Sequence, residues 1–363
     1  MPNVTLRAGA PDQLQVRSID VFSVFRNSFR YSTGSSLNYR KDLTNIDRIE
    51  IIKGLGSATT GRGEAGGVVN MITKKPREKR ATSIRGVLDN YGYYKTELDT
   101  TGSLTQNGKV LYRAIAAYTG GETYSPNEEY DLINFYPSLL FRFNDRTNLL
   151  IEGSLQSGET PGATLFEIAD FRKEFKRAGS NNAIVPNLPN VGALQKIPTL
   201  DLRHPVTLPW IDPDAQIYEV ATTLNHKFTD WLSTRQTALL YKGEVDREFL
   251  RLSGQLSGEA GWIFRPTDTA RLNPIDFVYA LLFETNETDL KFFSYQGDFL
   301  LEYHTGAMAH QTLLGYEYTT RSLFNRTKRV TDNRGYRVIE NRPYLSLKRS
   351  DMLPQALTTH TDR

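Results

Sequence analysis

The stretch that decides the fold runs from Ile133 to Phe143 and reads Ile-Asn-Phe-Tyr-Pro-Ser-Leu-Leu-Phe-Arg-Phe. Every second residue, starting at Ile133, is apolar, whereas the residues between them include Asn134 and Ser138. Successive side chains of a β-strand point to opposite faces, so this alternation predicts a strand with one apolar and one polar face. The same alternation returns at 293–303 and at 312–319.

The lengths of these runs favour a membrane barrel. They extend for about 10 residues, which is what a tilted strand needs to cross a bilayer, whereas strands in water-soluble proteins average about 5–6. The expected connections alternate between tight turns (106–109, 144–146 and 229–231) and long polar segments (119–131, 156–214, 249–288 and from 325 onward). This alternation is typical of outer-membrane barrels.

The pattern predicts about nine antiparallel strands after residue 80. They are expected at 82–90, 93–103, 110–118, 132–143, 147–155, 216–228, 232–247, 289–303 and 311–323. Aromatic residues beside the tight turns predict an interfacial girdle, although the same residue types also occur in the core of a soluble β-sandwich. These residues are Phe143, Phe228, Trp231 and Tyr303.

Composition excludes several functional classes. The net charge of +3 gives no case for nucleic-acid binding, and the absence of cysteine removes disulfides, cysteine-ligated metals and thiol catalysis. No apolar run approaches the roughly 20 residues of a transmembrane helix. Residues 1–6 carry no signal-peptide pattern, and the polar residues 357–363 complete no strand, so we expect a chain truncated at both ends.

No catalytic or metal-binding constellation emerges. Gly61, Gly63 and Gly66 match a dinucleotide fingerprint, but the residues after them predict a strand where that fingerprint requires a helix. His304 and His310 flank a tight turn and give a weak metal signal. The basic run 74–80 is interpreted as a solvated linker, and the alternative is a face attracted to anionic lipid or to a partner. We therefore expect no enzyme activity, no cofactor and no metal ligands.

One segment resembles a known family. Residues 42–54 read DLTNIDRIEIIKG, and residues 57–76 continue into GRGEAGGVVNMITKKP. This is similar to the plug domain of TonB-dependent outer-membrane receptors, in particular the ferrichrome-type siderophore receptors. Residues 26–30 (RNSFR) resemble the RNGFR element of those plugs, with Ser28 in place of glycine. Leu55 likewise replaces the usual proline of the family.

The resemblance implies a fold and a domain division. The fold class is all-β: a partial N-terminal plug at 1–76, followed by a partial antiparallel transmembrane barrel at 77–363, with about nine of the roughly 22 strands of such plugged barrels. The family's signal peptide and energy-coupling box are expected to be absent from this chain. The location it implies is the outer membrane of a Gram-negative bacterium.

It also implies a function and site residues. The family imports ferric siderophores using the TonB complex, and the iron arrives already chelated. The expected siderophore contacts at the plug apex are Phe22, Arg26, Arg30 and Tyr31, although each of these could equally pack the plug or pair with the barrel. Arg48 and Glu50 are expected to hold the plug inside the barrel wall. The other motif positions are the glycines Gly54, Gly61, Gly63, Gly66 and Gly67.

The partners implied are a ferric siderophore, the TonB complex and outer-membrane lipid, with the protein acting as a monomer. Four alternatives remain at this point: a passive porin-like barrel, a non-functional gene fragment, a barrel enzyme, and a soluble β-sandwich binding module. The plug motif argues against a porin, and strand length argues against a sandwich.

Overall fold

The structure is a computed structural model, and it describes residues 4–7, 10–16, 19–21, 24–31, 42–53, 67–122, 129–160, 214–253, 278–331, 336–337 and 358–362. Every regular element within these ranges is a β-strand. Among the described residues, no helix is long and apolar enough to cross a membrane.

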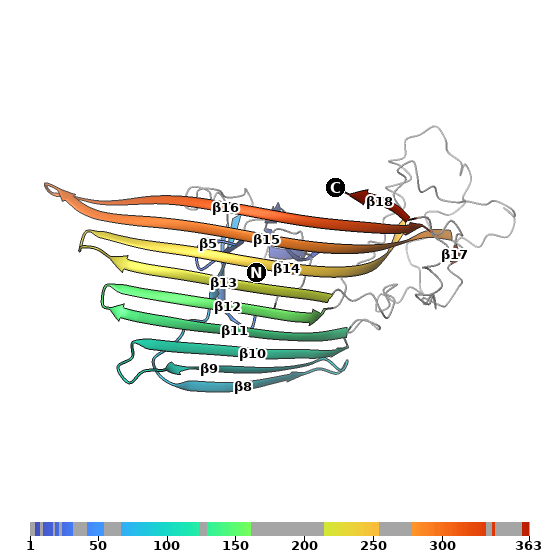
Figure 1. The fold of residues 1–363 in the computed structure, drawn as a ribbon, viewed down its shortest axis with the longest axis horizontal. Coiled ribbons are helices and arrows are strands. Elements are labelled where there is room, and N and C mark those ends of the chain that lie inside the picture. Colours follow the sequence, from blue (N-terminus) through green and yellow to red (C-terminus); the bar gives the residue numbers. More distant parts are fainter. Residues whose placement is uncertain are drawn as a thin grey trace.

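Nine long strands form one antiparallel sheet in which each strand pairs with its neighbours in sequence (Figure 1). The expected number of strands and the all-β fold class are therefore confirmed. The tight turns gather at one end of the sheet, and the strands lengthen from β8 toward β15. The strands are β8 (Ala81–Leu88), β9 (Tyr94–Ser103), β10 (Val110–Glu122), β11 (Glu129–Asn144), β12 (Thr147–Glu159), β13 (Asp214–Lys227), β14 (Leu232–Ser253), β15 (Val278–Thr305) and β16 (Met308–Thr331).

Two short strands extend this sheet, and two small sheets precede it. β17 (Tyr336–Arg337) pairs with β15, and β18 (Thr358–Asp362) pairs with β16. One small sheet contains β1 (Val4–Arg7), β2 (Ala10–Val16) and β3 (Ile19–Val21). The other, which we call the plug sheet, has the order β5-β4-β7-β6 and contains β4 (Val24–Arg26), β5 (Phe29–Arg30), β6 (Ile46–Lys53) and β7 (Gly67–Thr73).

In the plug sheet, the strand expected after the glycine-rich segment is β7. β7 begins at Gly67, whose φ of 137° lies in the region that favours glycine. A strand therefore follows the glycine-rich segment, as expected, and not the helix that a dinucleotide site would need. The boundaries 1–76 and 77–363 themselves stay predictions, although the long sheet begins at Ala81.

Burial in the long sheet is inverted relative to a water-soluble protein. On β11 the apolar residues Ile133 and Phe143 are 60% and 54% exposed, whereas Asn134 is fully buried and Ser138 is 9% exposed. We call the face that carries Asn134 the inner face and the face that carries Ile133 the outer face. Such an arrangement is stable where the apolar face meets lipid and the polar face meets protein.

The plug sheet packs against the inner face. A buried apolar cluster joins Phe29 and Tyr31 of the plug to residues of β11 and β13–β15. The barrel members of this cluster are Leu132, Ala215, Ile217, Leu239, Tyr241, Val245, Leu290 and Phe292. The inner face is therefore covered by another part of the same chain.

The strands extend further toward the long connections than expected. β15 begins at Val278 and β16 continues to Thr331, where the sequence predicted polar loops at 249–288 and from 325 onward. The extension of β15 lacks alternation: residues 278–283 read Val-Tyr-Ala-Leu-Leu-Phe, and residues 284–288 read Glu-Thr-Asn-Glu-Thr. An apolar run followed by a polar run has no period of two, so periodicity alone could not detect this part.

The aromatic residues beside the tight turns lie on the surface. Phe143, Phe228, Trp231 and Tyr303 are each about half exposed, between 45% and 54%. This exposure fits the predicted girdle and disagrees with the core of a soluble sandwich.

Candidate functional site

The candidate site is the contact between the plug sheet and the inner face. Its apex is a hairpin of β4 and β5, in which Phe25 pairs with Arg30 and Arg26 pairs with Phe29. The turn residues Asn27 and Ser28 both have positive φ, of 51° and 65°. This two-residue geometry suits glycine at the second position, the residue that Ser28 replaces.

Hydrogen bonds to β7 hold the turn in that conformation. The Asn27 backbone N–H donates to the Met71 carbonyl at 2.9 Å. The Ser28 N–H donates to Asn70 Oδ1, also at 2.9 Å. The hairpin is thus fixed to the plug sheet, and its side chains project toward the barrel.

Three of the four expected siderophore contacts lie together at this hairpin. Arg26 is buried and forms an ion pair with Glu219 of β13. Arg30 Nε lies 3.7 Å from Glu317 Oε1 of β16. Tyr31 packs edge-to-face on Tyr241 of β14 with ring centroids 6.3 Å apart. Phe22 lies outside the described residues.

Cations and aromatic rings alternate around the hairpin. The Arg26 guanidinium lies 6.0 Å from the Tyr31 ring centre, and that of Arg30 lies 5.8 Å from the Phe25 ring centre. Burial raises the pKa of Tyr31 to about 12, against the opposing effect of the Arg26 charge. Tyr31 is therefore a neutral phenol at physiological pH.

A second polar cluster centres on Glu152 of β12, which sequence reasoning missed. Its carboxylate accepts from Lys75 Nζ at 3.0 Å, from Thr73 Oγ1 at 2.5 Å and from Asn27 Nδ2 at 3.3 Å. Arg235 of β14 donates to the Asn27 carbonyl at 2.6 Å. Burial lowers the pKa of the Lys75 ammonium, and the Glu152 charge offsets part of that effect.

Two further carboxylates, Asp99 and Asp42, form ion pairs that join the plug to the barrel. Lys74 Nζ lies 3.3 Å from Asp99 of β9, and Arg113 of β10 makes two contacts of 2.7 and 2.8 Å with the same carboxylate. Asp42 accepts from Lys95 of β9 at 2.7 Å. The interpretation of 74–80 as a solvated linker is therefore wrong for Lys74 and Lys75, which pair with barrel carboxylates, whereas residues 77–80 are exposed.

The environment of Asp42 keeps it ionised. Burial opposes its charged form, but hydrogen bonds from Lys95 and Thr44 outweigh this effect and lower the pKa of the carboxyl. Tyr136 of β11 donates a further hydrogen bond to Asp42 Oδ1 at 3.1 Å. Asp42 therefore joins the plug to two barrel strands as a carboxylate.

The family motif residues lie within the plug. Arg48 pairs with Glu50 at 2.9 Å, and Glu50 accepts from Asn70 of β7 at 3.0 Å. Among the described residues, their hydrogen bonds and ion pairs are to plug residues, and their expected contact with the barrel wall stays a prediction. Gly67 begins β7, and the other motif glycines Gly54, Gly61, Gly63 and Gly66 lie outside the described residues.

His304 and His310 do not form a joint site. His310 pairs with Tyr303 in register, and their rings stack with centroids 5.0 Å apart. His304 is the next residue of β15, so it points to the other face of the sheet. The weak metal signal of this turn is therefore not supported.

The site is a polar interface and offers reversible contacts. A buried ion pair contributes little net stability compared with an apolar contact, because desolvation offsets most of its attraction, but it fixes orientation. Arg26–Glu219, Lys75–Glu152 and Asp42–Lys95 thus position the plug against the wall. Contacts of this kind can be exchanged for water one after another.

Comparisons with known proteins agree with this architecture. No protein-family model matches the chain. The chain is 30% identical over 159 residues to the ferripyoverdine receptor of Pseudomonas aeruginosa, covering 42% of this chain and 19% of the receptor. It is 24% identical over 304 residues to the ferrioxamine receptor of Yersinia enterocolitica, covering 82% of this chain and 37% of the receptor.

A solved structure shows the same fold. The open form of the ferric-catecholate import receptor of Escherichia coli K12 superimposes with a TM-score of 0.69 at 17% identity, covering 91% of this chain and 46% of that receptor. The chain thus spans less than half the length of the proteins it matches. They are transport receptors and not enzymes. They support the family of TonB-dependent siderophore receptors, and they do not single out its ferrichrome-type members.

Proposed function

We propose that this chain is part of a TonB-dependent receptor that imports ferric siderophores across the outer membrane of a Gram-negative bacterium. The proposal rests on the opposite character of the two faces of the long sheet. The inner face carries buried polar residues and is covered by the plug sheet of the same chain, whereas the outer face carries exposed apolar residues. Two of its relatives are receptors for ferripyoverdine and for ferrioxamine, and they supply the substrate class of this proposal. We propose that the receptor works as a monomer in outer-membrane lipid.

The iron in this proposal is cargo and not a cofactor. A ferric siderophore holds its metal with its own oxygen ligands, so the protein needs to recognise only a bulky, oxygen-rich ligand. Arginine donors and aromatic faces suit such a ligand. We propose that Phe22, Arg26, Arg30 and Tyr31 contribute to its recognition at the plug apex. To reach Arg26, the siderophore would compete with Glu219 for the guanidinium group.

Ligand binding and energy coupling would act on the same contact. A siderophore that engages Arg26 or Arg30 competes with Glu219 and Glu317 for the guanidinium groups. The plug would then be held less firmly against the wall, and force from the TonB complex could displace it. The remaining pairs, Lys75–Glu152 and Asp42–Lys95, would keep the plug in place when no ligand is bound.

Uptake by intact cells tests the transport function. Cells without other siderophore receptors would express the protein and receive radioactive iron bound to hydroxamate, catecholate or pyoverdine-type siderophores. We expect accumulation of one of these complexes, abolished by a protonophore. Accumulation that persists after the proton-motive force collapses would contradict energy coupling and favour a passive porin.

Binding measurements test the site residues. Arg30→Gln combined with Tyr31→Phe is expected to weaken binding of the accepted siderophore about tenfold, because one charge-assisted contact and one hydroxyl are lost. Arg142→Gln is the matched control, since Arg142 pairs with Glu78 at 2.9 Å near a tight turn, far from the hairpin. Equal binding by both variants would remove the hairpin from the recognition site.

A further inference from the structure

Two amide side chains on the inner face are buried without the hydrogen bonds that they can form. Asn134 of β11 is fully buried, and neither its Oδ1 nor its Nδ2 has a hydrogen-bond partner in the part of the chain that the structure describes. Gln156 of β12 lies directly opposite Asn134, and its buried Oε1 has no partner there either. The Gln156 Nε2 donates to Ser154 at 3.3 Å. We call Asn134 and Gln156 the amide pair.

The amide pair lies between two contacts of the plug with the barrel. On one side of Asn134 along β11, Leu132 belongs to the buried apolar cluster that joins the plug to the barrel. On the other side, Tyr136 donates to Asp42 of the plug at 3.1 Å. Asn134 therefore lies within the contact between plug and barrel, but among the described residues its amide takes no part in the hydrogen bonds of that contact.

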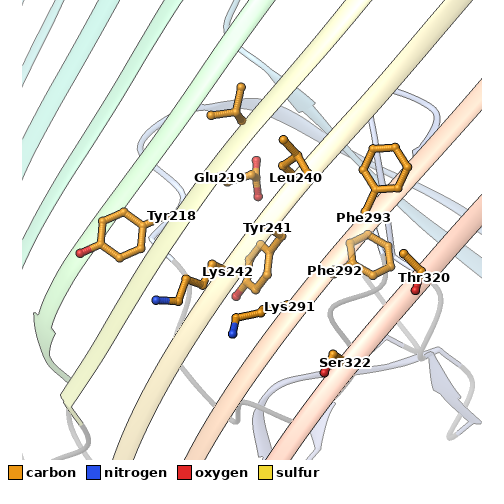
Figure 2. Close-up of a pocket in the computed structure, with 11 residues that line it drawn as sticks. Tyr218, Glu219, Leu240, Tyr241, Lys242, Lys291, Phe292, Phe293, Thr320 and Ser322 are labelled. Carbon is orange, nitrogen blue, oxygen red and sulfur yellow. The ribbon is translucent and has the colours of Figure 1, made fainter.

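The plug compensates the buried charge in the next row of the inner face toward the tight turns. This row consists of four residues in register across β12–β15, the last three of which are labelled in Figure 2: Ser154, Glu219, Tyr241 and Phe292. Glu219 is buried, and Arg26 of the plug pairs with it. In the row of the amide pair, the neighbours in register are Ala117 and Ile217, whose side chains offer no hydrogen bond.

An unpaired amide is unfavourable only while it is buried. A buried donor or acceptor without a partner has lost its hydrogen bonds to water and gained none in return. Once water reaches the group, that cost disappears. The closed position of the plug is therefore destabilised relative to any position in which the amide pair is hydrated, because the two positions differ in this cost.

We infer that the amide pair is a weak point built into the contact between plug and barrel, where water first enters when the plug is displaced. It favours separation of the plug from β11 and β12, while the ion pairs of Glu152 and Glu219 still fix the orientation of the plug. Its role in transport rests on the proposed import function, whereas its effect on the plug contact does not.

Labelling of single cysteines by a water-soluble maleimide tests where water enters. The chain has no cysteine, and Ser138 of β11 and Ser294 of β15 are buried in one row of the inner face. In detergent, we expect Ser138→Cys to be labelled faster than Ser294→Cys. Adding Asn134→Leu is expected to slow labelling at 138 about tenfold, because the closed contact then buries two fewer unpaired atoms, and to leave labelling at 294 unchanged.

Two further variants serve as a replicate and a control. Gln156→Met is expected to slow labelling at 138 by a smaller factor, since only one of its amide atoms is unpaired. Asn225→Leu removes an amide of the same face that is paired with Asn148 at 3.0 Å. We expect Asn225→Leu to lower the midpoint of denaturant unfolding and Asn134→Leu to raise it.

Several outcomes would overturn the weak point. These are a lower unfolding midpoint for Asn134→Leu, unchanged labelling at 138, equal slowing at 138 and 294, or labelling at 294 that is as fast as at 138 before Asn134 is changed.

Uptake measurements separate this inference from the proposed function. Asn134→Leu is expected to lower the maximal rate of siderophore uptake several-fold and to leave siderophore affinity unchanged, because displacement of the plug and not recognition is affected. An unchanged maximal rate, or an equal loss of affinity, would overturn the role in transport. A chain that imports no siderophore would refute the proposed function, and the labelling rates would still decide whether the amide pair is a weak point.

Discussion

The inner and outer faces of the long sheet come from the same nine strands, yet they follow opposite rules. Along β11, fully buried Asn134 points toward the plug, while its neighbour Ile133 is 60% exposed. The inner face contacts the plug through a buried apolar cluster and through ion pairs and hydrogen bonds around Glu152, Glu219 and Asp99. The outer face carries leucine, phenylalanine and tyrosine at the surface.

Each face is matched to a different neighbour. Lipid chains offer no hydrogen bonds, so the outer face is stable with apolar side chains. The plug offers charged partners, so the inner face can hold carboxylates that would be costly if left alone. The two faces thus suit an apolar neighbour on the outer side and a charged neighbour on the inner side.

The largest effect is expected from removing an inner-face charge. Glu219→Ala leaves the buried Arg26 guanidinium without its carboxylate, and breaking such a pair costs about 3–5 kcal/mol in the free energy of unfolding. Denaturant titration in detergent measures this loss. Glu302→Ala, at an exposed carboxylate near a tight turn, is the control and is expected to stay within about 0.5 kcal/mol. Equal stability of both variants would contradict the role of the pair.

The next effect is expected from a charge on the outer face. Leu139 lies in register with Ile151, Thr222 and Ala238 on the outer face of the long sheet. Leu139→Arg is expected to lower the free energy of folding into lipid vesicles by about 2–4 kcal/mol, as for arginine near the midplane of a barrel. Leu139→Met is the volume-matched control. A loss below about 0.5 kcal/mol would indicate a surface that faces water.

Acidification is expected to weaken the contact between the plug and the inner face at Asp42. The pKa of Asp42 is lowered in the folded protein, so its stabilising effect is complete above its unfolded value of 3.8 and is lost as the pH falls through the lower folded value. We expect the midpoint of denaturant unfolding to fall more steeply between pH 5 and pH 2 than in Asp42→Asn. Parallel pH profiles for the two proteins would remove Asp42 from this effect.

The smallest effect is expected at the plug hairpin. Ser28 has a φ of 65°, a conformation that glycine adopts without steric cost. Ser28→Gly is expected to stabilise the protein by about 0.5 kcal/mol, since relief of strain exceeds the added flexibility of the unfolded chain. Ser28→Ala retains the Cβ and is expected to give no gain. Thermal unfolding of the three proteins distinguishes these outcomes.

Much of this architecture could be predicted from sequence, for a physical reason. In a strand between lipid and protein, apolar and polar side chains alternate strictly. The sequence of Ile133–Phe143 therefore predicts which residues lie on each face. The extensions of β15 and β16 could not be predicted, because apolar and polar residues do not alternate there. The partners Lys75 and Glu152 are 77 residues apart, and their contact depends on strand register and on the position of the plug.

The hairpin residues show a different limit. Arg26, Arg30 and Tyr31 lie together at the hairpin, but sequence alone could not tell a ligand contact from a contact with the barrel. An arginine that pairs with a carboxylate and one that awaits an anionic ligand have the same local sequence. Only the register of β13 and β16 supplies Glu219 and Glu317.

A direct measurement can test whether lipid covers the outer face and the plug covers the inner face. The chain has no cysteine, so single cysteines from 133 to 143 can each carry one spin label. In lipid vesicles we predict that labels at Ile133, Phe135 and Leu139 respond to oxygen, which concentrates in lipid, whereas labels at Asn134 and Ser138 respond to neither oxygen nor a water-soluble relaxant. Oxygen access at the second pair, or no alternation along β11, would contradict the account.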